Sequence, residues 1–257
     1  MSLADAGALA LSILMASAAG LVGCFALMRR MTLAADAISH VALPGIGLAL
    51  ALHLPPLLGA LAMLFVGAFL IWGLQSKTRL PTETIVGVVF SAALAIGSMI
   101  TSGEELIDAL LGQPGTLPLW EAGLACVATV AVIAFILTQK GTMVLSLLSR
   151  DVAHAAGVKV ARLDLLYLLG FALTVALGLR FLGVLLMGAL IIIPAATARR
   201  LARGLDQMLA LAVAFSVVST VAGIYVGRWF DVQTGPPIVV IAAGLFLLSL
   251  LVRPRAT

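Results

Sequence analysis

The sequence predicts an all-α fold, a polytopic membrane bundle of about nine transmembrane helices, and three observations point to it. Of the 257 residues, 63% are hydrophobic and only 10% are charged, whereas a soluble domain is usually near half apolar and a quarter charged. The mean hydropathy is +1.22. Apolar segments of roughly 20 residues, long enough to span a bilayer, recur along the whole chain. Helices are expected because open sheet edges cannot face lipid.

Short polar or proline-containing connections separate these apolar segments. Pro55 and Pro56 separate the second from the third, and residues 77–81 separate the third from the fourth. A polar connection covers 102–118, and the longest connection covers 139–163. The predicted spans are 6–28, 33–52, 55–75, 82–101, 119–138, 164–180, 182–199, 207–227 and 235–252. We expect one transmembrane domain over 1–257, without a separate soluble domain.

The distribution of lysine and arginine predicts an N-terminus outside and a C-terminus inside. With that orientation, all of the 15 basic residues except Arg180 and Arg228 fall at inner connections or in the C-terminal tail, as the positive-inside rule requires. The same rule predicts two helices in 164–199, because a single helix there would put Arg199 and Arg200 on the opposite side from 139–163. The inner basic residues are Arg29, Arg30, Lys77, Arg79, Lys140, Arg150, Lys159, Arg162, Arg199, Arg200, Arg203, Arg253 and Arg255.

Several functional classes are excluded or disfavoured by the sequence. The isoelectric point is 9.6, but the basic residues are scattered between apolar spans, so they indicate membrane topology and not a nucleic-acid surface. The chain has no GxxxxGK[ST] loop, no nucleophile elbow and no HExxH motif. Cys24 and Cys126 both lie inside apolar spans, so no disulfide framework is implied. We therefore expect no enzyme and no permanently bound cofactor.

The pair Asp36 and His40 stands out because both lie in an otherwise apolar segment, 33–50. On a helix their spacing places both side chains on one face, about 6 Å apart along the axis. An acid within lipid costs about 3 kcal/mol, so the pair needs a protein or aqueous environment. Carboxylate and neutral imidazole both ligate divalent cations. Two interpretations are open: a cation site on a permeation path, or a polar contact between helices.

The connection at about 146–160 contains a predicted short helix. Residues 153–156 precede Gly157, a typical helix C-cap, and Asp151 is a plausible N-cap. A short helix between two spans on the cytoplasmic face is typical of an element that docks a soluble partner, but an ordinary interfacial amphipathic segment fits the pattern as well. His154 is expected to be a surface residue.

Three blocks resemble the permease subunits of bacterial ABC importers for zinc, manganese and iron(II), the ABC-3 family. They are GCFALMRRMTLAADAISHVALPGIGLAL at 23–50, SRDVAHAAGVKVARLDLLYLL at 149–169 and FLGVLLMGALIIIPAATARRLAR at 181–203. The resemblance extends from Gly23 to about Val252. Ala35 stands where many members have glycine before the aspartate.

The resemblance implies a homodimeric permease in the bacterial cytoplasmic (inner) membrane. Two cytoplasmic ABC ATPase subunits and an extracytoplasmic metal-binding protein would complete the importer, so ATP hydrolysis would belong to a separate subunit. The matching Asp36 and His40 would contact the transported metal. The connection around 146–160 would dock in a groove of the ATPase, through the positions Asp151, Ala153, Ala156 and Gly157.

Zinc is the expected cargo, because PAATARRLARGLDQMLALA at 194–212 and TGPPIVV at 234–240 resemble the zinc-uptake permeases most closely. An Asp–His pair does not itself distinguish Zn²⁺ from Mn²⁺ or Fe²⁺. The alternatives are therefore a manganese or iron(II) permease of the same family, an ATP-independent cation transporter or channel, and a permease for a siderophore, heme or cobalamin. The last usually has a longer chain and would give Asp36 and His40 no role as ligands.

Overall fold

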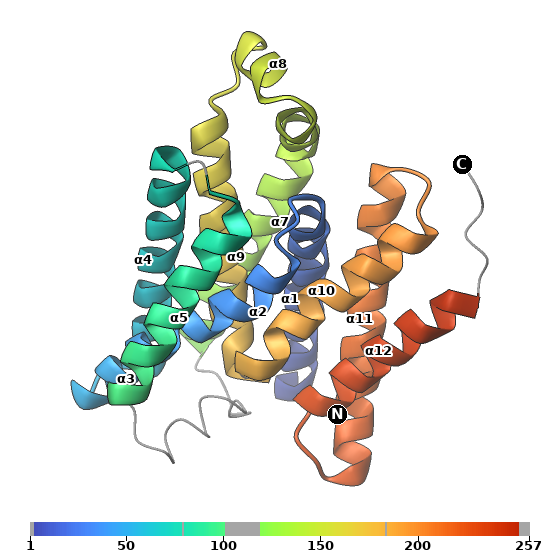
Figure 1. Cartoon of the computed structure of the whole chain (residues 1–257). Helices are drawn as coiled ribbons and strands as arrows, with labels where there is room; N and C mark the ends of the chain where they lie inside the picture. Colours follow the sequence, from blue (N-terminus) through green and yellow to red (C-terminus); the bar gives the residue numbers. More distant parts are fainter. Residues whose placement is uncertain (1–2, 79, 101–118, 183, 252–257) are drawn as a thin grey trace.

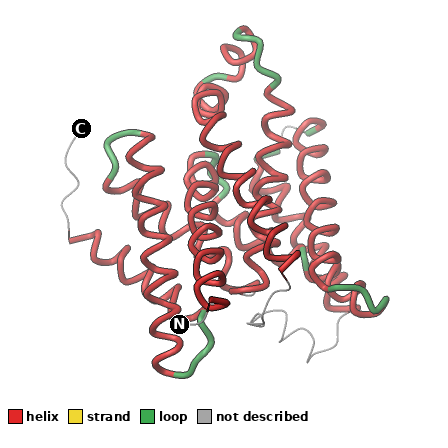
Figure 2. Tube along the Cα trace, turned by 180° about the vertical axis from the view of Figure 1, so that it is seen from behind, coloured by secondary structure: helices red, strands yellow, loops and turns green. Residues whose placement is uncertain are grey.

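The computed structural model describes residues 3–78, 80–100, 119–182 and 184–251, and all regular structure in these ranges is α-helical (Figures 1 and 2). The helices pack side by side, with most connections at the two ends of the bundle (Figure 2). They are α1 (Leu3–Met28), α2 (Thr32–Val41), α3 (Leu43–Ala51), α4 (Pro56–Lys77), α5 (Thr82–Ile100), α7 (Leu119–Leu148), α8 (Arg150–Ala155), α9 (Val160–Leu182), α10 (Val184–Leu201), α11 (Leu205–Phe230) and α12 (Gly235–Leu251).

Each predicted apolar region contains a helix, which confirms the all-helical prediction for the described residues. Six helices are long and apolar enough to cross a membrane within these residues, and two shorter apolar helical stretches cover Asp36–Ala51, which spans parts of α2 and α3, and Gly235–Leu251. The region 164–199 does contain two helices, α9 and α10. The number of nine spans and the sidedness of the termini stay predictions.

The second predicted span is interrupted at Ala42, between α2 and α3, although Ala42 itself keeps a right-handed helical backbone with φ −68° and ψ −26°. Pro44 causes the break, since it lacks the N–H that would bond the carbonyl of His40, and its ring crowds that carbonyl. The chain resumes as a helix at Leu43, and the Ile46 N–H donates to the Ala42 carbonyl at 2.9 Å. Gly45 then packs so closely on α4 that a Cβ at Gly59 would overlap its carbonyl oxygen.

The core forms around α1. In the apolar part of α1, 67% of the residues are buried, whereas the corresponding share is 22% in α5 and in α7. The largest fully buried side chains include Phe25 of α1, Tyr167 and Phe171 of α9, and Ile191 of α10. Large apolar side chains remain exposed on α4, α5, α7 and α12. Such faces are expected where helices meet lipid rather than water.

The connections predicted to be cytoplasmic gather at one end of the bundle. In Figure 1, the α1–α2 and α10–α11 connections and the C-terminal end of α4 lie toward the same end as α8, while the α11–α12 connection lies at the other. This arrangement matches the alternation on which the positive-inside argument depends.

Two predicted boundaries need correction. The helix predicted to end at 138 continues as α7 to Leu148, and the helix predicted to begin at 164 begins at Val160. Helices continue beyond the bilayer when polar residues such as Gln139 and Lys140 are good helix formers. The predicted connection 102–118 lies outside the described residues.

Candidate functional site

Asp36 and His40 lie on α2, between α5 and α10. Asp36 is exposed on the surface of the chain and His40 is half-buried. Both belong to one regular helix, so the i, i+4 spacing places them on one face as the sequence predicts. The Ser39 hydroxyl donates to the Asp36 carbonyl oxygen at 2.6 Å and leaves the Asp36 carboxylate free of that contact.

The imidazole of His40 packs against α5. Its ring centre lies 5.6 Å from that of Phe90, with a tilt of 56° between the rings. Its Nδ1 atom is buried and has no hydrogen-bond partner within the described part of the chain. A buried polar atom without a partner carries a desolvation cost. One of the two ring nitrogens of His40 therefore makes no hydrogen bond within the described residues.

One feature of the backbone around the pair favours a cation. His40 lies in the last turn of α2, where the helix dipole places partial negative charge. Pro44 has no N–H to donate to the His40 carbonyl, and backbone N–H groups at the end of α2 bond the carbonyls of Ser39 and His40 instead.

One chain offers few ligands at this position. Among the described residues, no group of three or more histidine, cysteine, aspartate or glutamate side chains is close enough to hold a metal ion. Asp36 and His40 thus supply at most two side-chain ligands per chain. Two ligands suit an ion in transit better than a structural zinc site, which normally has four.

The short helix α8 lies at the tip of the connection between α7 and α9, at the upper end of Figure 1. Gly157 ends it with φ +78°, and the Val158 N–H donates to the Ala153 carbonyl at 3.0 Å, the pattern of a Schellman motif. The predicted glycine cap is therefore confirmed. Asp151, Ala156 and Gly157 are exposed, whereas Ala153 is fully buried within the chain.

The predicted N-cap was wrong by two residues. The cap of α8 is Ser149, whose hydroxyl oxygen accepts from the Val152 N–H at 3.3 Å. Asp151 lies in the first turn instead, where a carboxylate still interacts favourably with the helix dipole. His154 is exposed, as predicted.

Sequence reasoning missed an ion cluster at the base of α8. Asp164 of α9 binds both Arg29, in the turn after α1, and Arg150, the first residue of α8. An acid in the first turns of an apolar span was the available signal. The partners were not predictable, because Arg29 lies 135 positions away from Asp164.

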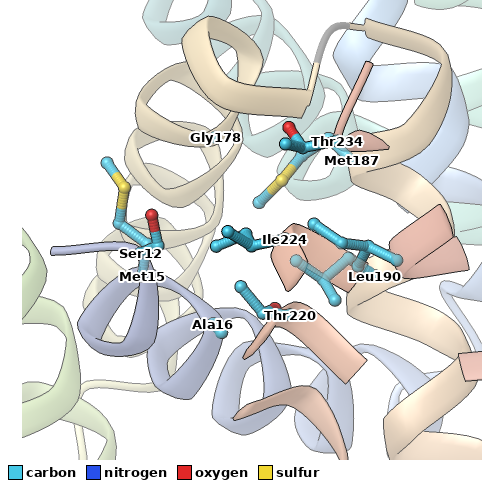
Figure 3. A pocket seen from close by; sticks show the side chains of 10 residues that line it. Ser12, Met15, Ala16, Gly178, Met187, Leu190, Thr220, Ile224 and Thr234 are labelled. Carbon is cyan, nitrogen blue, oxygen red and sulfur yellow. The ribbon is translucent and has the colours of Figure 1, made fainter. Parts of the chain in front are cut away.

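A separate cavity of about 50 Å³ lies between α1, α9, α10, α11 and α12 (Figure 3). Ser12 and Thr220 are among its few polar residues, and the Thr220 hydroxyl is buried without a hydrogen-bond partner in the described ranges. Met187 fills the neighbouring space against Gly178. The cavity lacks carboxylate and imidazole groups, so it suits a few water molecules and not a divalent cation.

The comparisons with known proteins cover nearly the whole chain. A family profile described as "ABC 3 transport family" matches residues 6–253. The chain belongs to this family. The match confirms the resemblance inferred from the three sequence blocks.

Relatives in the family are named for different metals. The chain is 28% identical over 240 residues to the "High-affinity zinc uptake system membrane protein ZnuB" of Haemophilus influenzae, with 91% of this chain and 92% of the relative covered. It is 31% identical over 253 residues to the "Manganese transport system membrane protein MntC" of Halalkalibacterium halodurans, covering 96% and 87%. A "Probable iron transport system membrane protein" of Haemophilus influenzae is 32% identical over 239 residues, covering 90% and 86%.

Solved structures share the fold. The chain resembles a chain of "PsaBC from Streptococcus pneumoniae in complex with Fab" with a TM-score of 0.84 and 28% identity, covering 99% of this chain and 93% of the other. It also resembles "An inward-facing conformation of a putative metal-chelate type ABC transporter", with a TM-score of 0.70 and 19% identity, covering 94% and 84%. The second likeness concerns the fold alone.

Proposed function

We propose that this chain is the permease subunit of an ATP-driven importer that moves a divalent transition-metal ion, with Zn²⁺ as the expected cargo, into the bacterial cytoplasm. The observation that carries the proposal is the family match over residues 6–253. The matched relatives are named for zinc, manganese and iron transport and align over most of their own length.

The chemistry of α2 supports a metal ion as cargo. Asp36 supplies a carboxylate, His40 an imidazole, and the end of α2 partial negative charge. Exposure of Asp36 on the surface of the single chain allows a second copy to contribute the same pair, which gives four ligands at a shared axis. A small number of ligands binds the ion weakly enough for it to leave again, which transport requires.

These residues alone do not identify the transported metal. Imidazole and carboxylate ligands bind Zn²⁺ more tightly than Mn²⁺ or Fe²⁺ in the usual affinity order, and this supports zinc. The partners in the proposal are a second copy of the chain, cytoplasmic ABC ATPase subunits at α8, and an extracytoplasmic metal-binding protein. The exposed positions Asp151, Ala156 and Gly157 form the proposed docking surface, with Ala153 as its buried anchor.

Uptake into proteoliposomes tests the proposal. Vesicles containing the permease, its ATPase and its binding protein are loaded with ATP or with a non-hydrolysable analogue, and initial uptake of Zn²⁺, Mn²⁺ and Fe²⁺ is compared. We expect uptake that requires ATP and is fastest for Zn²⁺. Faster uptake of Mn²⁺ or Fe²⁺ would change the cargo and keep the importer. Equal uptake without ATP hydrolysis would overturn the importer in favour of a channel or an ATP-independent transporter.

A further inference from the structure

At the end of the bundle where α8 lies, one carboxylate joins three segments of the chain. Asp164 Oδ1 accepts from Arg29 Nη1 at 2.7 Å, and Asp164 Oδ2 accepts from Arg150 Nη2 at 3.1 Å. Arg150 opens α8, Asp164 lies in the second turn of α9, and Arg29 lies between α1 and α2. Each oxygen thus binds a different guanidinium, so movement of one arginine changes the position of the carboxylate for the other.

The two arginines differ in how firmly they are held. The side chains of Arg29 and Asp164 are each 10% exposed, whereas that of Arg150 is 70% exposed. Arg29 Cζ also lies 4.4 Å from the centre of the Tyr167 ring, and the Tyr167 hydroxyl donates to the Val22 carbonyl at 3.1 Å. The side chain of Arg29 is therefore held inside the helix bundle, and that of Arg150 faces solvent.

The hydrogen bonding of Arg29 is incomplete. Its Nε and Nη2 atoms are buried without a hydrogen-bond partner among the described residues, although a guanidinium carries five N–H donors. Asp164 is thus the carboxylate that neutralises this buried cation. Withdrawal of Asp164 would leave a buried charge unpaired, which is strongly unfavourable, so the turn that carries Arg29 must respond when Asp164 moves.

That turn leads directly into the helix of the candidate metal site. Arg30 adopts φ +58°, and the Met31 N–H donates to the Ala26 carbonyl at 2.8 Å, which closes the turn tightly after α1. Met31 is buried and α2 begins at Thr32. Asp36 and His40 follow on the same helix, so a displacement of the turn tilts or shifts both side chains together.

We propose that Asp164 is a positioning residue that couples α8 to the metal-site helix α2 through the ion cluster Arg150–Asp164–Arg29. The inference rests on the proposed function, in which the ATPase docks at α8. Closure of the ATPase moves α8 and with it Arg150. The carboxylate of Asp164 follows, and the response of Arg29 changes the position of Asp36 and His40.

The test uses the complete importer in proteoliposomes and measures Zn²⁺ uptake and ATP hydrolysis in the same vesicles. Asp164→Asn preserves the size of the side chain and removes its charge. We expect the number of ions transported per ATP to fall about fivefold or more, the size of a typical coupling between sites. A merely structural defect lowers uptake and hydrolysis together and leaves their ratio unchanged.

A matched control is available at the same end of the bundle. Lys140 and Asp206 form an ion pair between α7 and α11, with side chains 40% and 80% exposed. Asp206→Asn removes one carboxylate without touching the α8–α2 connection, so its ratio of ions to ATP is expected to equal that of the wild type. An equal fall in both variants would overturn the inference.

Arg150 supplies a second pair of variants in case Asp164→Asn fails to fold. Arg150→Ala should lower the ratio of ions to ATP, and Arg150→Lys should restore part of it, while co-purification shows that the ATPase still binds. An unchanged ratio in Arg150→Ala overturns the inference. Absence of ATP-dependent uptake in the wild type is a different result, because it overturns the proposed function itself.

Discussion

Gly188 of α10 lies directly against the backbone of Asp36. A Cβ at position 188 would come within 2.8 Å of the Asp36 Cα atom and 3.0 Å of its nitrogen. Cβ atoms in real proteins essentially never approach another atom so closely. The two nearest atoms belong to the backbone of Asp36, so rotation of a side chain cannot relieve the clash. The absence of a side chain at Gly188 therefore determines how near α10 comes to α2, the helix of the candidate site.

Gly188→Ala is expected to displace α2 and to slow uptake while the protein still folds. Overpacking of this kind typically costs about 1–3 kcal/mol. Uptake and thermal unfolding in detergent check the prediction. Gly73→Ala in α4 is the control, since a Cβ there meets no atom within 4 Å. Wild-type uptake by Gly188→Ala would show that the close approach has no functional role.

The break between α2 and α3 should matter for transport. Pro44→Ala restores the missing N–H and permits a continuous helix across Ala42. We expect stability to be maintained or increased and Zn²⁺ uptake to fall, because a regular helix would change the backbone geometry next to His40. Pro236→Ala is the matched control, since Pro236 lies in the first turn of α12, where proline breaks nothing. The role of the break is refuted if both variants transport like the wild type.

The N-cap of α8 can be tested by amide hydrogen exchange. Ser149→Ala removes the acceptor of the Val152 N–H and should cost about 1 kcal/mol of local stability. Exchange at Val152 is then expected to accelerate roughly fivefold, as about 1 kcal/mol implies. Asp151→Asn is the comparison, and it should change this exchange less. The opposite order would restore Asp151 as the cap.

The C-terminal end of α8 depends on a left-handed residue. Gly157 has φ +78° and a Cβ there would meet no atom within 4 Å, so any cost of substitution comes from the backbone and not from a clash. Gly157→Ala should destabilise the end of α8 by about 1 kcal/mol, and Gly157→Asn by less, because asparagine tolerates this conformation. Limited proteolysis of the connection measures both. Equal cleavage of the wild type and both variants would contradict the prediction.

Much of the fold could be predicted from the sequence because the bilayer restricts the possible structures. Apolar segments near the length of a membrane span can only be helices, and Lys and Arg mark their ends. The ends themselves were less predictable. Gln139 and Lys140 interrupt the apolar pattern but do not end α7, since hydropathy measures burial in lipid and not helix formation.

The candidate site was predicted only in part. The spacing of Asp36 and His40 on one helix face follows from helix geometry alone. The contacts of His40 with Phe90 and of Asp36 with Gly188 join segments far apart in the chain, and no local pattern encodes them. The break at Ala42 did have a signal, because Pro44 lies four residues after His40.

The initial rate of ATP-driven Zn²⁺ uptake by Asp36→Asn tests the central proposal most directly. This variant removes one ligand and preserves the shape of the side chain. Asp231→Asn is the matched control, because Asp231 is an exposed aspartate in a left-handed conformation that asparagine also adopts. We predict a loss of about tenfold or more in Asp36→Asn, at least the effect of losing an outer-shell partner of a metal, and wild-type uptake in Asp231→Asn. Equal uptake by both variants would contradict a metal-transit site on α2.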